Sequence, residues 1–415
     1  MSSEWIETDW GSIATLEYGK GLRDYRSGGG AYPVYGTNGQ VGHCESFLCP
    51  HAGIVVGRKG AYRGIHYSAN PFYVIDTAYW LKPKIDLDLK WAYYELLRQD
   101  INSLDSGSAI PSTTRDAFYS LDVFLPPIEE QKEIAHILGT LDDKIELNRK
   151  TNETLEAMAK ALFKSWFVDF DPVRAKAEGR PTGLPAEISD LFPVSFEDSE
   201  LGEIPSGWKV MELGMVSTFL NGYAFKSVDW QDNGVPVVKI GSVKPGFVDV
   251  EKVSFVSDEI ASSKRRYRIS PGDILIGMTG AYIGEFGLVP HSENPPLLNQ
   301  RVGKVTQLEG GFISRFFLYN WMTNSSFKEK IKMLSHGSAQ ENISSETIQS
   351  ICLTIPTKDV ASAFDLLGQP IIDDLLINNS EQIIISGLRD TLLPKLISGE
   401  IRIPDAERML EEVGI

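Results

Sequence analysis

The 415-residue sequence has few cysteines and no long hydrophobic segment. Only Cys44, Cys49 and Cys352 occur, which is too few for the disulfide framework of a small secreted domain. No uninterrupted apolar run approaches the roughly 20 residues needed to cross a bilayer. The N-terminus carries acidic residues where a signal peptide has a basic start. These absences predict a cytoplasmic protein with no membrane partner.

A basic excess is also missing. The chain has 56 acidic residues against 40 Lys and Arg, a net charge of −16. Free-standing nucleic-acid binders usually carry a positive excess, because neutralising phosphates supplies much of their affinity. A DNA-binding role would therefore require either that positive charge is concentrated on one face or that partner subunits provide much of the contact with the DNA backbone.

Motifs for catalysis are absent or incomplete. No phosphate-binding loop of the Gly-x-x-x-x-Gly-Lys-Ser/Thr type occurs, so we expect no ATP hydrolysis by this chain. Asn70-Pro71-Phe72-Tyr73 resembles the Asn-Pro-Pro-Tyr motif of amino-methyltransferases but lacks the second proline, and we interpret it as a turn. Glu130-Gln131-Lys132 could mimic the Glu-x-Lys motif of nucleases. It lies at the exposed start of a predicted helix, so we interpret it as part of the helix surface.

Two His/Cys pairs are the only sequence feature that suggests a metal. They are His43-Cys44 and Cys49-Pro50-His51, whose side chains are zinc ligands in other proteins. Their separation is loose and no second set of ligands follows. We therefore expect no catalytic residue, no metal site and no cofactor in this chain.

The sequence contains an internal repeat. Trp5, Gly11 and Ile13 match Trp208, Gly214 and Val216 at an offset of 203 residues, and the turn Gly57–Gly64 resembles Gly277–Gly284 at an offset of 220. The tripeptide Gly-Ser-Ala at 107–109 recurs at 337–339, and Pro126 matches Pro356, both at an offset of 230. Because the order is kept while the offset grows from 203 to 230, the second copy has gained 27 residues.

Each copy reads as a β-rich domain. Short runs rich in Val, Ile, Phe and Tyr, such as AGIVVGR and GDILIGM, alternate with turn residues, and a helical stretch follows at 89–104 and 312–334. The predicted fold class is α+β, with two similar domains. The expected division is a first domain (1–125), a long helix (126–170), a linker (171–199), a second domain (200–357), a second long helix (358–403) and a C-terminal tail (404–415).

The segments after the two domains have a helical period. Apolar and amide side chains recur at alternating spacings of four and three, which is typical of a coiled-coil seam, at Ile134, Leu138, Leu141, Ile145, Asn148, Asn152, Leu155, Ala159, Leu162 and Trp166. The matching positions in the second copy are less regular, and Pro370, Gly387 and Pro394 are expected to weaken or kink that helix. Each helix is too long and one-sided to be buried in its own domain, so we expect the two to pack together.

Amide side chains interrupt both seams near the middle, at Asn148 and Asn152 and at the matching positions Asn378 and Gln382. In an antiparallel pair these positions would meet and fix register and orientation; the alternative is that some of them face solvent. Such a pair would hold the two domains, related by an approximate two-fold axis, at opposite ends of a rod about 60 Å long, at about 1.5 Å per residue. This geometry suits two short DNA elements that flank an unread spacer.

This organisation resembles the specificity subunit of type I restriction-modification systems over essentially the whole chain. The resemblance is carried by the Gly-Ser-Ala tripeptides and by the segments LPPIEEQKEI, LDDKIELNRKTNETLEAMAKALFKSWFVDFDPV, SELGEIPSGW and LLPKLISGEIRI. It implies that each β-rich domain is a target-recognition domain that reads one half of a split, asymmetric site in double-stranded DNA.

The resemblance also implies partners. The paired helices would bind two methyltransferase subunits, and motor-nuclease subunits would join them to make the restriction enzyme. S-adenosylmethionine, ATP and Mg²⁺ would then belong to these partners. The alternative is a non-catalytic coiled-coil scaffold for protein interactions, whose domains bind no DNA.

Candidate DNA contacts are basic and amide side chains on glycine-rich loops, because Lys and Arg bind phosphates and amides pair with base edges. In the first domain they are Arg58, Lys59, Tyr62 and Arg63, with Asn38 and Gln40 on the preceding loop. In the second domain they are Lys226, Lys239, Lys264, Arg265, Arg266 and Arg268, with Lys244 as a further candidate. For any single residue the alternative is a solvated surface charge. Arg301 and Lys304 are assigned instead to structural pairing in a strand.

Overall fold

A computed structural model describes residues 5–26, 28–104, 111–251, 253–335, 342–412 and 414, and these form two compact units. The first unit combines Met1–Ile145 with the C-terminal segment Ile385–Ile415, and the second unit is Glu146–Ile384. No helix among the described residues is long and apolar enough to cross a membrane.

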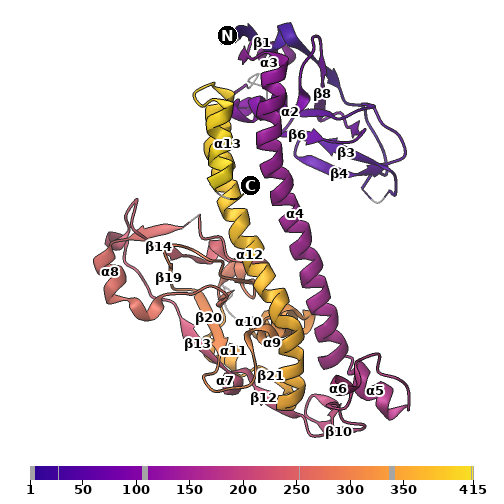
Figure 1. Cartoon of the computed structure of the whole chain (residues 1–415), viewed down its shortest axis with the longest axis vertical. Coiled ribbons are helices and arrows are strands. Elements are labelled where there is room, and N and C mark those ends of the chain that lie inside the picture. The colour runs from indigo at the N-terminus through magenta and orange to yellow at the C-terminus, as the bar shows by residue number, and fades with distance from the viewer. Residues whose placement is uncertain are drawn as a thin grey trace. The chain divides into compact units, whose positions relative to one another are not determined.

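The first unit is a β-rich domain with short helices at its edges (Figure 1). Its elements are β1 (Ile6–Asp9), α1 (Trp10–Ile13), β2 (Ala14–Tyr18), β3 (Tyr32–Gly36), β4 (Gly39–Cys44), β5 (Gly53–Gly57), β6 (Ile65–Ser68), β7 (Tyr73–Val74), β8 (Ala78–Pro83), α2 (Leu89–Arg98), η1 (Ile101–Ser103), α3 (Arg115–Tyr119), β9 (Asp122–Leu125) and, near the C-terminus, α13 (Ile403–Glu412). Here η marks a short 3-10 helix.

The described part of this domain contains three sheets, of which the smallest is the antiparallel pair β1-β9. Strands pair in the order β2-β8-β5-β6 in an antiparallel sheet and in the order β4-β3-β7 in a second sheet. The central strand β5 is buried along its whole length, as expected for the apolar run GIVVG. Large aromatic side chains with no exposed surface, Trp10, Trp91, Tyr94 and Phe118, fill the core beneath.

The second unit contains the other β-rich domain. Its elements are α5 (Asp171–Ala177), α6 (Ala186–Ser189), β10 (Phe196–Ser199), β11 (Gly202–Pro205), β12 (Lys209–Glu212), α7 (Leu213–Val216), β13 (Ser217–Asn221), η2 (Ser227–Asp229), β14 (Val235–Val238), η3 (Ile240–Ser242), β15 (Gly246–Phe247), β16 (Ser254–Val256), α8 (Asp258–Ser263), η4 (Arg265–Tyr267), β17 (Ile274–Gly277), η5 (Gly280–Tyr282), β18 (Phe286–Leu288), β19 (Leu297–Leu298), β20 (Val302–Gln307), α9 (Arg315–Thr323), α10 (Ser325–Ser335), α11 (Ser345–Gln349) and β21 (Cys352–Ile355).

The two domains share one topology. The order β13-β20-β17-β18 repeats β2-β8-β5-β6, and β16-β14-β19 repeats β4-β3-β7 with the same parallel and antiparallel pairings. Even an isolated bridge is repeated, since Lys59 pairs with Ser112 and Thr279 pairs with Asn342. The predicted α+β repeat is therefore confirmed, although the Gly-Ser-Ala tripeptides at 107–109 and 337–339 lie outside the described residues.

Part of the extra length of the second copy lies in its loops. β15 is added in the connection between β14 and β16, and it extends the large sheet by pairing with β18. α8 and η4 occupy the connection between β16 and β17. These additions carry the basic run 264–268, so the two domains differ on the loops that were predicted to contact DNA.

Two helices of 40 residues each, α4 (Ile128–Phe167) and α12 (Lys358–Ile397), follow the two domains. In the first unit, Ile134, Leu138 and Leu141 of α4 share a core with Ile385, Leu392 and Leu396 of α12. In the second unit, Ala159, Phe163 and Trp166 share a core with Phe364, Ile372 and Leu376. The first unit brings residues near the start of α4 together with residues near the end of α12, and the second unit brings residues near the end of α4 together with residues near the start of α12. The helix segments within each unit are therefore antiparallel.

The prolines of α12 do not interrupt it. The helix continues through Pro370 and Pro394, both on exposed positions. A helical proline frees the carbonyl oxygen four residues earlier, which is that of Leu366 or Asp390 here. Both of these residues are exposed, so water can bind the freed oxygens. The expected weakening therefore leaves a continuous helix.

Two segments differ from the predicted division of the chain. The segment 171–199 is expected to be a linker, but Val173 and Phe192 are buried in the core of the second unit. The segment 404–415 is expected to be a tail, but it belongs mostly to α13, whose Ala406 and Leu410 are buried in the first unit. The four-residue spacing of Ala406 and Leu410 is a helical signal that the sequence reading overlooked.

The half-buried carboxyl of Asp365 on α12 gives a prediction for stability. Asp365 accepts a hydrogen bond from Ser314, the N-cap of α9, and burial raises its pKa to about 6. Because the folded-state pKa is raised, Asp365 lowers the free energy of unfolding as pH rises from about 4 to about 6. We expect Asp365→Asn to be more stable than the parent at pH 7, and this advantage to disappear below about pH 4.

Thermal unfolding between pH 3.5 and pH 7.5 measures this difference. Asp373→Asn, an exposed position on the same helix, is the control and should follow the parent at every pH. A constant offset between Asp365→Asn and the parent across the range would contradict the prediction.

Candidate nucleic-acid interface

Three loops of the first domain converge on one surface. Gly64 N donates to Thr37 O at 3.0 Å, which ties the loop 57–64 to the β3–β4 turn. Gly60 N donates to Pro111 O at 3.0 Å, which ties the same loop to the segment before α3. A Cβ at Gly57 would lie 2.6 Å from Thr37 Oγ1, so only glycine permits this approach.

Most of the predicted contact residues of the first domain lie exposed on these loops. Asn38, Gln40 and Lys59 are exposed, and 64% of the Tyr62 surface is accessible. Gln40 Nε2 lies 3.2 Å from His43 Nε2, so this amide is partly engaged by a neighbour on the same strand. Whether any of them contacts DNA stays a prediction.

Arg63 departs from the prediction. Its side chain is only 2% exposed, and its guanidinium donates to Thr113 Oγ1 at 2.9 Å, Gly60 O at 2.9 Å and Asn102 O at 2.7 Å. A buried guanidinium whose hydrogen bonds are met by the protein cannot reach a phosphate. Arg63 therefore supports the loop from beneath, because the carbonyl groups of a tight loop need donors.

Arg58 belongs to an aromatic cluster that the sequence did not reveal. Its guanidinium carbon lies 4.8 Å from the ring centre of Tyr18 and 5.7 Å from that of Tyr79. Arg115, the first residue of α3, lies 4.1 Å from the same Tyr18 ring. The two arginines are far apart along the chain, and only the fold brings them to one tyrosine.

In the second domain, the predicted lysines stack on a row of aromatic rings. The ring centres of Trp230 and Phe225 lie 5.5 Å apart, those of Phe225 and Tyr223 5.0 Å, and those of Tyr223 and Tyr267 5.3 Å. Lys239 Nζ lies 4.0 Å from the Trp230 ring and Lys264 Nζ lies 4.3 Å from the Tyr223 ring. Such cation–π contacts hold ammonium groups in place without neutralising them.

The remaining cations of the second domain vary in exposure. Arg265, Arg266 and Lys226 are exposed, and the Arg266 guanidinium lies 5.6 Å from the Tyr267 ring. Arg268 is half-buried and donates to Pro295 O at 3.5 Å, so it is the weaker candidate. Lys244 Nζ lies 6.0 Å from the ring of the exposed Tyr282, which matches Tyr62 of the first copy. Lys304 pairs with Asp273 at 3.1 Å, in agreement with the structural role expected for it.

The net negative charge lies mainly outside the two segments that carry the candidate loops. Residues 126–203 and 358–415 hold 28 acidic and 14 basic side chains, whereas residues 1–125 and 204–357 hold 28 acidic and 26 basic. The net charge of −16 therefore divides into −14 and −2. The segments 1–125 and 204–357, which carry the candidate loops, are together close to neutral.

Several arginines along the helices are ion-paired, whereas four candidate arginines on the loops are not paired with any carboxylate that the structure describes. Along the helices, Arg149 pairs with Glu146 at 2.7 Å, Arg389 with Asp142 at 3.0 Å, Arg402 with Glu130 at 3.5 Å and Arg408 with Asp405 at 2.6 Å. Within the described part of the chain, no carboxylate pairs with Arg58, Arg115, Arg265 or Arg266. The unpaired guanidinium groups thus gather on the loop faces, where phosphates would meet them.

The helix pair contains the predicted polar layer, with different partners. In the second unit, Asn152 Nδ2 donates to Asn379 Oδ1 at 2.8 Å and Asn378 Nδ2 donates to Asn152 Oδ1 at 2.8 Å. Asn148 Nδ2 donates to Glu381 Oε2 at 2.7 Å rather than meeting Asn378. A constant sequence offset pairs Asn148 with Asn378, because it compares equivalent positions of the two copies. In antiparallel helices, however, a later residue of α4 contacts an earlier residue of α12, so the contacting pairs do not keep a constant offset. Asn152 is therefore the centre of the layer.

Gln382, the fourth predicted register residue, lines a cavity of about 420 Å³ beside this layer, together with Asn379 and Glu156. Burial raises the pKa of Glu156, which accepts a hydrogen bond from Tyr319 Oη at 3.3 Å. The register role of these residues remains a prediction.

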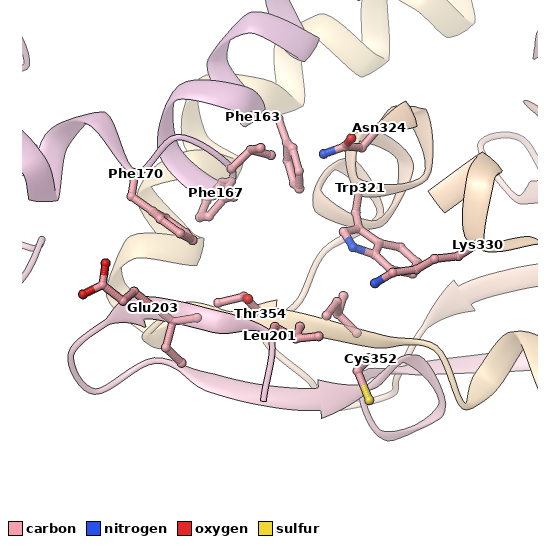
Figure 2. A pocket seen from close by; sticks show the side chains of 13 residues that line it. Phe163, Phe167, Phe170, Leu201, Glu203, Trp321, Asn324, Lys330, Cys352 and Thr354 are labelled. Atoms are coloured by element: carbon pink, nitrogen blue, oxygen red, sulfur yellow. The ribbon is translucent and has the colours of Figure 1, made fainter. Parts of the chain in front are cut away.

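Hollows elsewhere in the second unit offer no catalytic arrangement among the described residues. A hollow of about 270 Å³ at the end of α4 is lined by Phe163, Phe167 and Trp321, with Glu203 and Lys330 at its opposite sides (Figure 2). The Cys352 sulfur points away from the aromatic rings (Figure 2). In the first unit, Cys49 Sγ lies 3.6 Å from His51 Nδ1, and burial raises the pKa of this thiol. No group of three metal-binding side chains occurs in the described ranges.

The fold and the repeated loops define a protein of two equivalent recognition domains joined by paired helices. Residues 3–157 and 205–373 match the protein family described as "Type I restriction modification DNA specificity domain". Since these two segments cover most of the chain, the protein belongs to this family of type I restriction-modification specificity subunits. In such systems catalysis lies in separate methyltransferase and restriction subunits.

Individual relatives agree with this assignment. The chain is 29% identical over 333 residues to the "Type I restriction enzyme HindI specificity subunit" of Haemophilus influenzae, covering 70% of this chain and 71% of the relative. It is 28% identical over 326 residues to the "Type I restriction enzyme MjaVIII specificity subunit" of Methanocaldococcus jannaschii, covering 78% and 72%. Its fold is similar to that of the type I S subunit from M. genitalium, with a TM-score of 0.62, 18% identity and coverage of 95% and 96%.

The exposed arginines of the second domain give a prediction for DNA binding. Arg265→Ala/Arg266→Ala should weaken binding of duplex DNA and lower the slope of log affinity against log salt by roughly 2, because two phosphate contacts would be lost. Fluorescence anisotropy across a salt series measures both quantities. Lys164→Ala/Arg180→Ala is the matched control, since it changes net charge equally but removes two ion-paired cations. Equal slopes for the parent and the first variant would remove Arg265 and Arg266 from the interface.

The polar layer gives a prediction for stability. Asn152→Leu should lower the free energy of unfolding by about 1 kcal/mol, because it removes the partner of the half-buried Asn378 Nδ2 and Asn379 Oδ1. Urea unfolding measures the change. Thr151→Leu, at the adjacent exposed position of α4, is the control and should be nearly neutral. A parent-like midpoint for Asn152→Leu would show that the layer contributes nothing to pairing.

Proposed function

We propose that this chain reads a bipartite, asymmetric site in double-stranded DNA, one part with each β-rich domain. The observation that carries the proposal is that each domain has a surface of cations next to aromatic rings, built from different loops in the two copies. Both domains present guanidinium or ammonium groups that lie over aromatic rings and that no carboxylate of the described residues pairs with. Because the two copies differ in loop length, the two halves of the DNA site should differ in sequence.

The proposal assigns the paired helices a spacing role. A 40-residue helix is about 60 Å long at about 1.5 Å per residue, a length comparable with a short recognition site and its spacer. The layer centred on Asn152 supports this assignment, since buried polar contacts favour one register of a helix pair. A fixed register would give a fixed spacer length.

The proposal also includes partner subunits. Two methyltransferase subunits would bind along the helices, and motor-nuclease subunits would join them for restriction. S-adenosylmethionine, ATP and Mg²⁺ would be bound by these partners. The net charge of −16 supports shared binding of DNA with these partners, because a chain with this charge gains little attraction to phosphate from its overall field.

Co-expression with a type I adenine methyltransferase subunit tests the function directly. Single-molecule sequencing of host DNA should find methylated adenines in a motif of two separated parts, absent when this chain is omitted. The two parts should have different sequences. Co-purification of the two proteins without any methylated motif would favour the alternative, a scaffold for protein interactions. Methylation at a continuous motif would contradict the division of reading between two domains.

A further inference from the structure

We infer that Arg58 and Arg115 together form an anion site that binds a phosphate of the DNA backbone in the first half-site. This inference rests on the proposed function and names the ligand chemistry of one patch within it. Arg115 was not among the residues that the sequence suggested. Its role follows from three observations: its place beside Arg58, the absence of acidic partners, and the exposure of the tyrosine between them.

The first observation is the geometry of the cluster. The guanidinium carbons of Arg115 and Arg58 lie 4.1 Å and 4.8 Å from the ring centre of Tyr18. The two charges are therefore separated by less than the sum of these distances, which is within reach of one or two adjacent phosphates. Tyr79 lies behind, with its ring centre 5.1 Å from that of Tyr18.

Backbone hydrogen bonds hold both arginines in place. Arg58 N donates to Thr77 O at 3.0 Å and Arg58 O accepts from Thr113 N at 2.9 Å. Thr114 caps α3, the helix that begins at Arg115, by accepting from Ala117 N. Arg58 Nη1 also donates to Asp76 O at 3.1 Å. The cluster is thus built into the fold and does not consist of two mobile surface side chains.

The second observation concerns charge. Two like charges on one ring repel each other, and a chain with 56 acidic residues could readily supply a carboxylate between them. Among the described residues none does, whereas the arginines of the helices are ion-paired. Arg115 Nε is buried and has no hydrogen-bond partner in the described structure. A bound anion would supply the missing neutralisation.

The third observation concerns access. Tyr18 is 47% exposed, and the neighbouring Lys59 is exposed on the loop that continues from Arg58. A flat guanidinium that stacks on a ring keeps its N–H groups at the edge, where they match two phosphate oxygens. Arg58 and Arg115 hold this geometry before DNA arrives. Because phosphates are the same at every step, the site should position the duplex without reading its sequence.

Two substitutions of Arg115 separate an anion site from a packing role. Arg115→Met keeps an apolar stem on Tyr18 and removes the charge, while Arg115→Lys keeps the charge. With the full chain and its methyltransferase partner, Arg115→Met should bind specific and random duplexes about 3- to 10-fold more weakly and lower the salt slope by about 0.9, and Arg115→Lys should restore most of the slope. Arg408→Ala, which removes an ion-paired arginine from α13, is the charge-matched control and should resemble the parent.

A second probe does not require DNA recognition. Inorganic pyrophosphate should raise the thermal midpoint of the parent chain and have a clearly smaller effect on Arg115→Met. If pyrophosphate acts in this way but no duplex binds, with or without the methyltransferase, the anion site stands and the proposed DNA-reading function fails.

Three results would overturn the inference while leaving the proposed function intact. The first is DNA binding by Arg115→Met that equals that of the parent at every salt concentration. The second is a loss confined to the specific duplex, which would make Arg115 a reader of base edges. The third is an equal loss of affinity in Arg115→Met and Arg115→Lys, which would show that the charge at this position does not set the binding.

Discussion

The one-sided apolar seam of each long helix is the constraint on which this structure depends. A 40-residue helix with apolar side chains on one stripe must bury that stripe, and a domain of ordinary size covers only part of it. Each compact unit therefore uses segments from both halves of the chain. The core of the first unit contains Ile385 and Leu392 of α12, and that of the second contains Phe163 and Trp166 of α4. The unit that repeats in sequence is not the unit that is compact in space.

The segregation of charge follows from the same arrangement. The outer faces of the long helices carry acidic side chains, and their arginines are held in ion pairs, such as Arg149 with Glu146 and Arg389 with Asp142. Such surface pairs contribute little to stability, but they remove cations from any competition for phosphate. On the loops of the β-rich domains, aromatic rings take the place of carboxylates as neighbours of the cations. A strongly negative chain can in this way keep locally positive surfaces.

The sequence was sufficient for the features that depend on local pattern. The repeat, the strands around GIVVG and the helix seam follow from spacing, and the structure contains all of them. The failures concern features that depend on long-range contact. Arg63 looked like a loop cation because no local signal shows that Thr113 and Asn102 lie beneath it. Arg115 was missed for the opposite reason, since only the fold brings it to Tyr18, and the pairing of Asn148 with Glu381 depends on a helix crossing.

The added residues of the second domain are constrained by the helix as well as by the loop face. β15 lies in an insertion, yet Gly246 within it has a φ of +85°, and a Cβ there would lie 2.7 Å from Glu156 Oε1 of α4. Glu156 in turn accepts a hydrogen bond from Tyr319 of the domain core. The same connection contains Lys244, whose Nζ lies 6.0 Å from the ring of the exposed Tyr282. An insertion that changes the candidate DNA-reading loops thus also packs against α4, so recognition loops in this domain cannot vary in length independently of that helix.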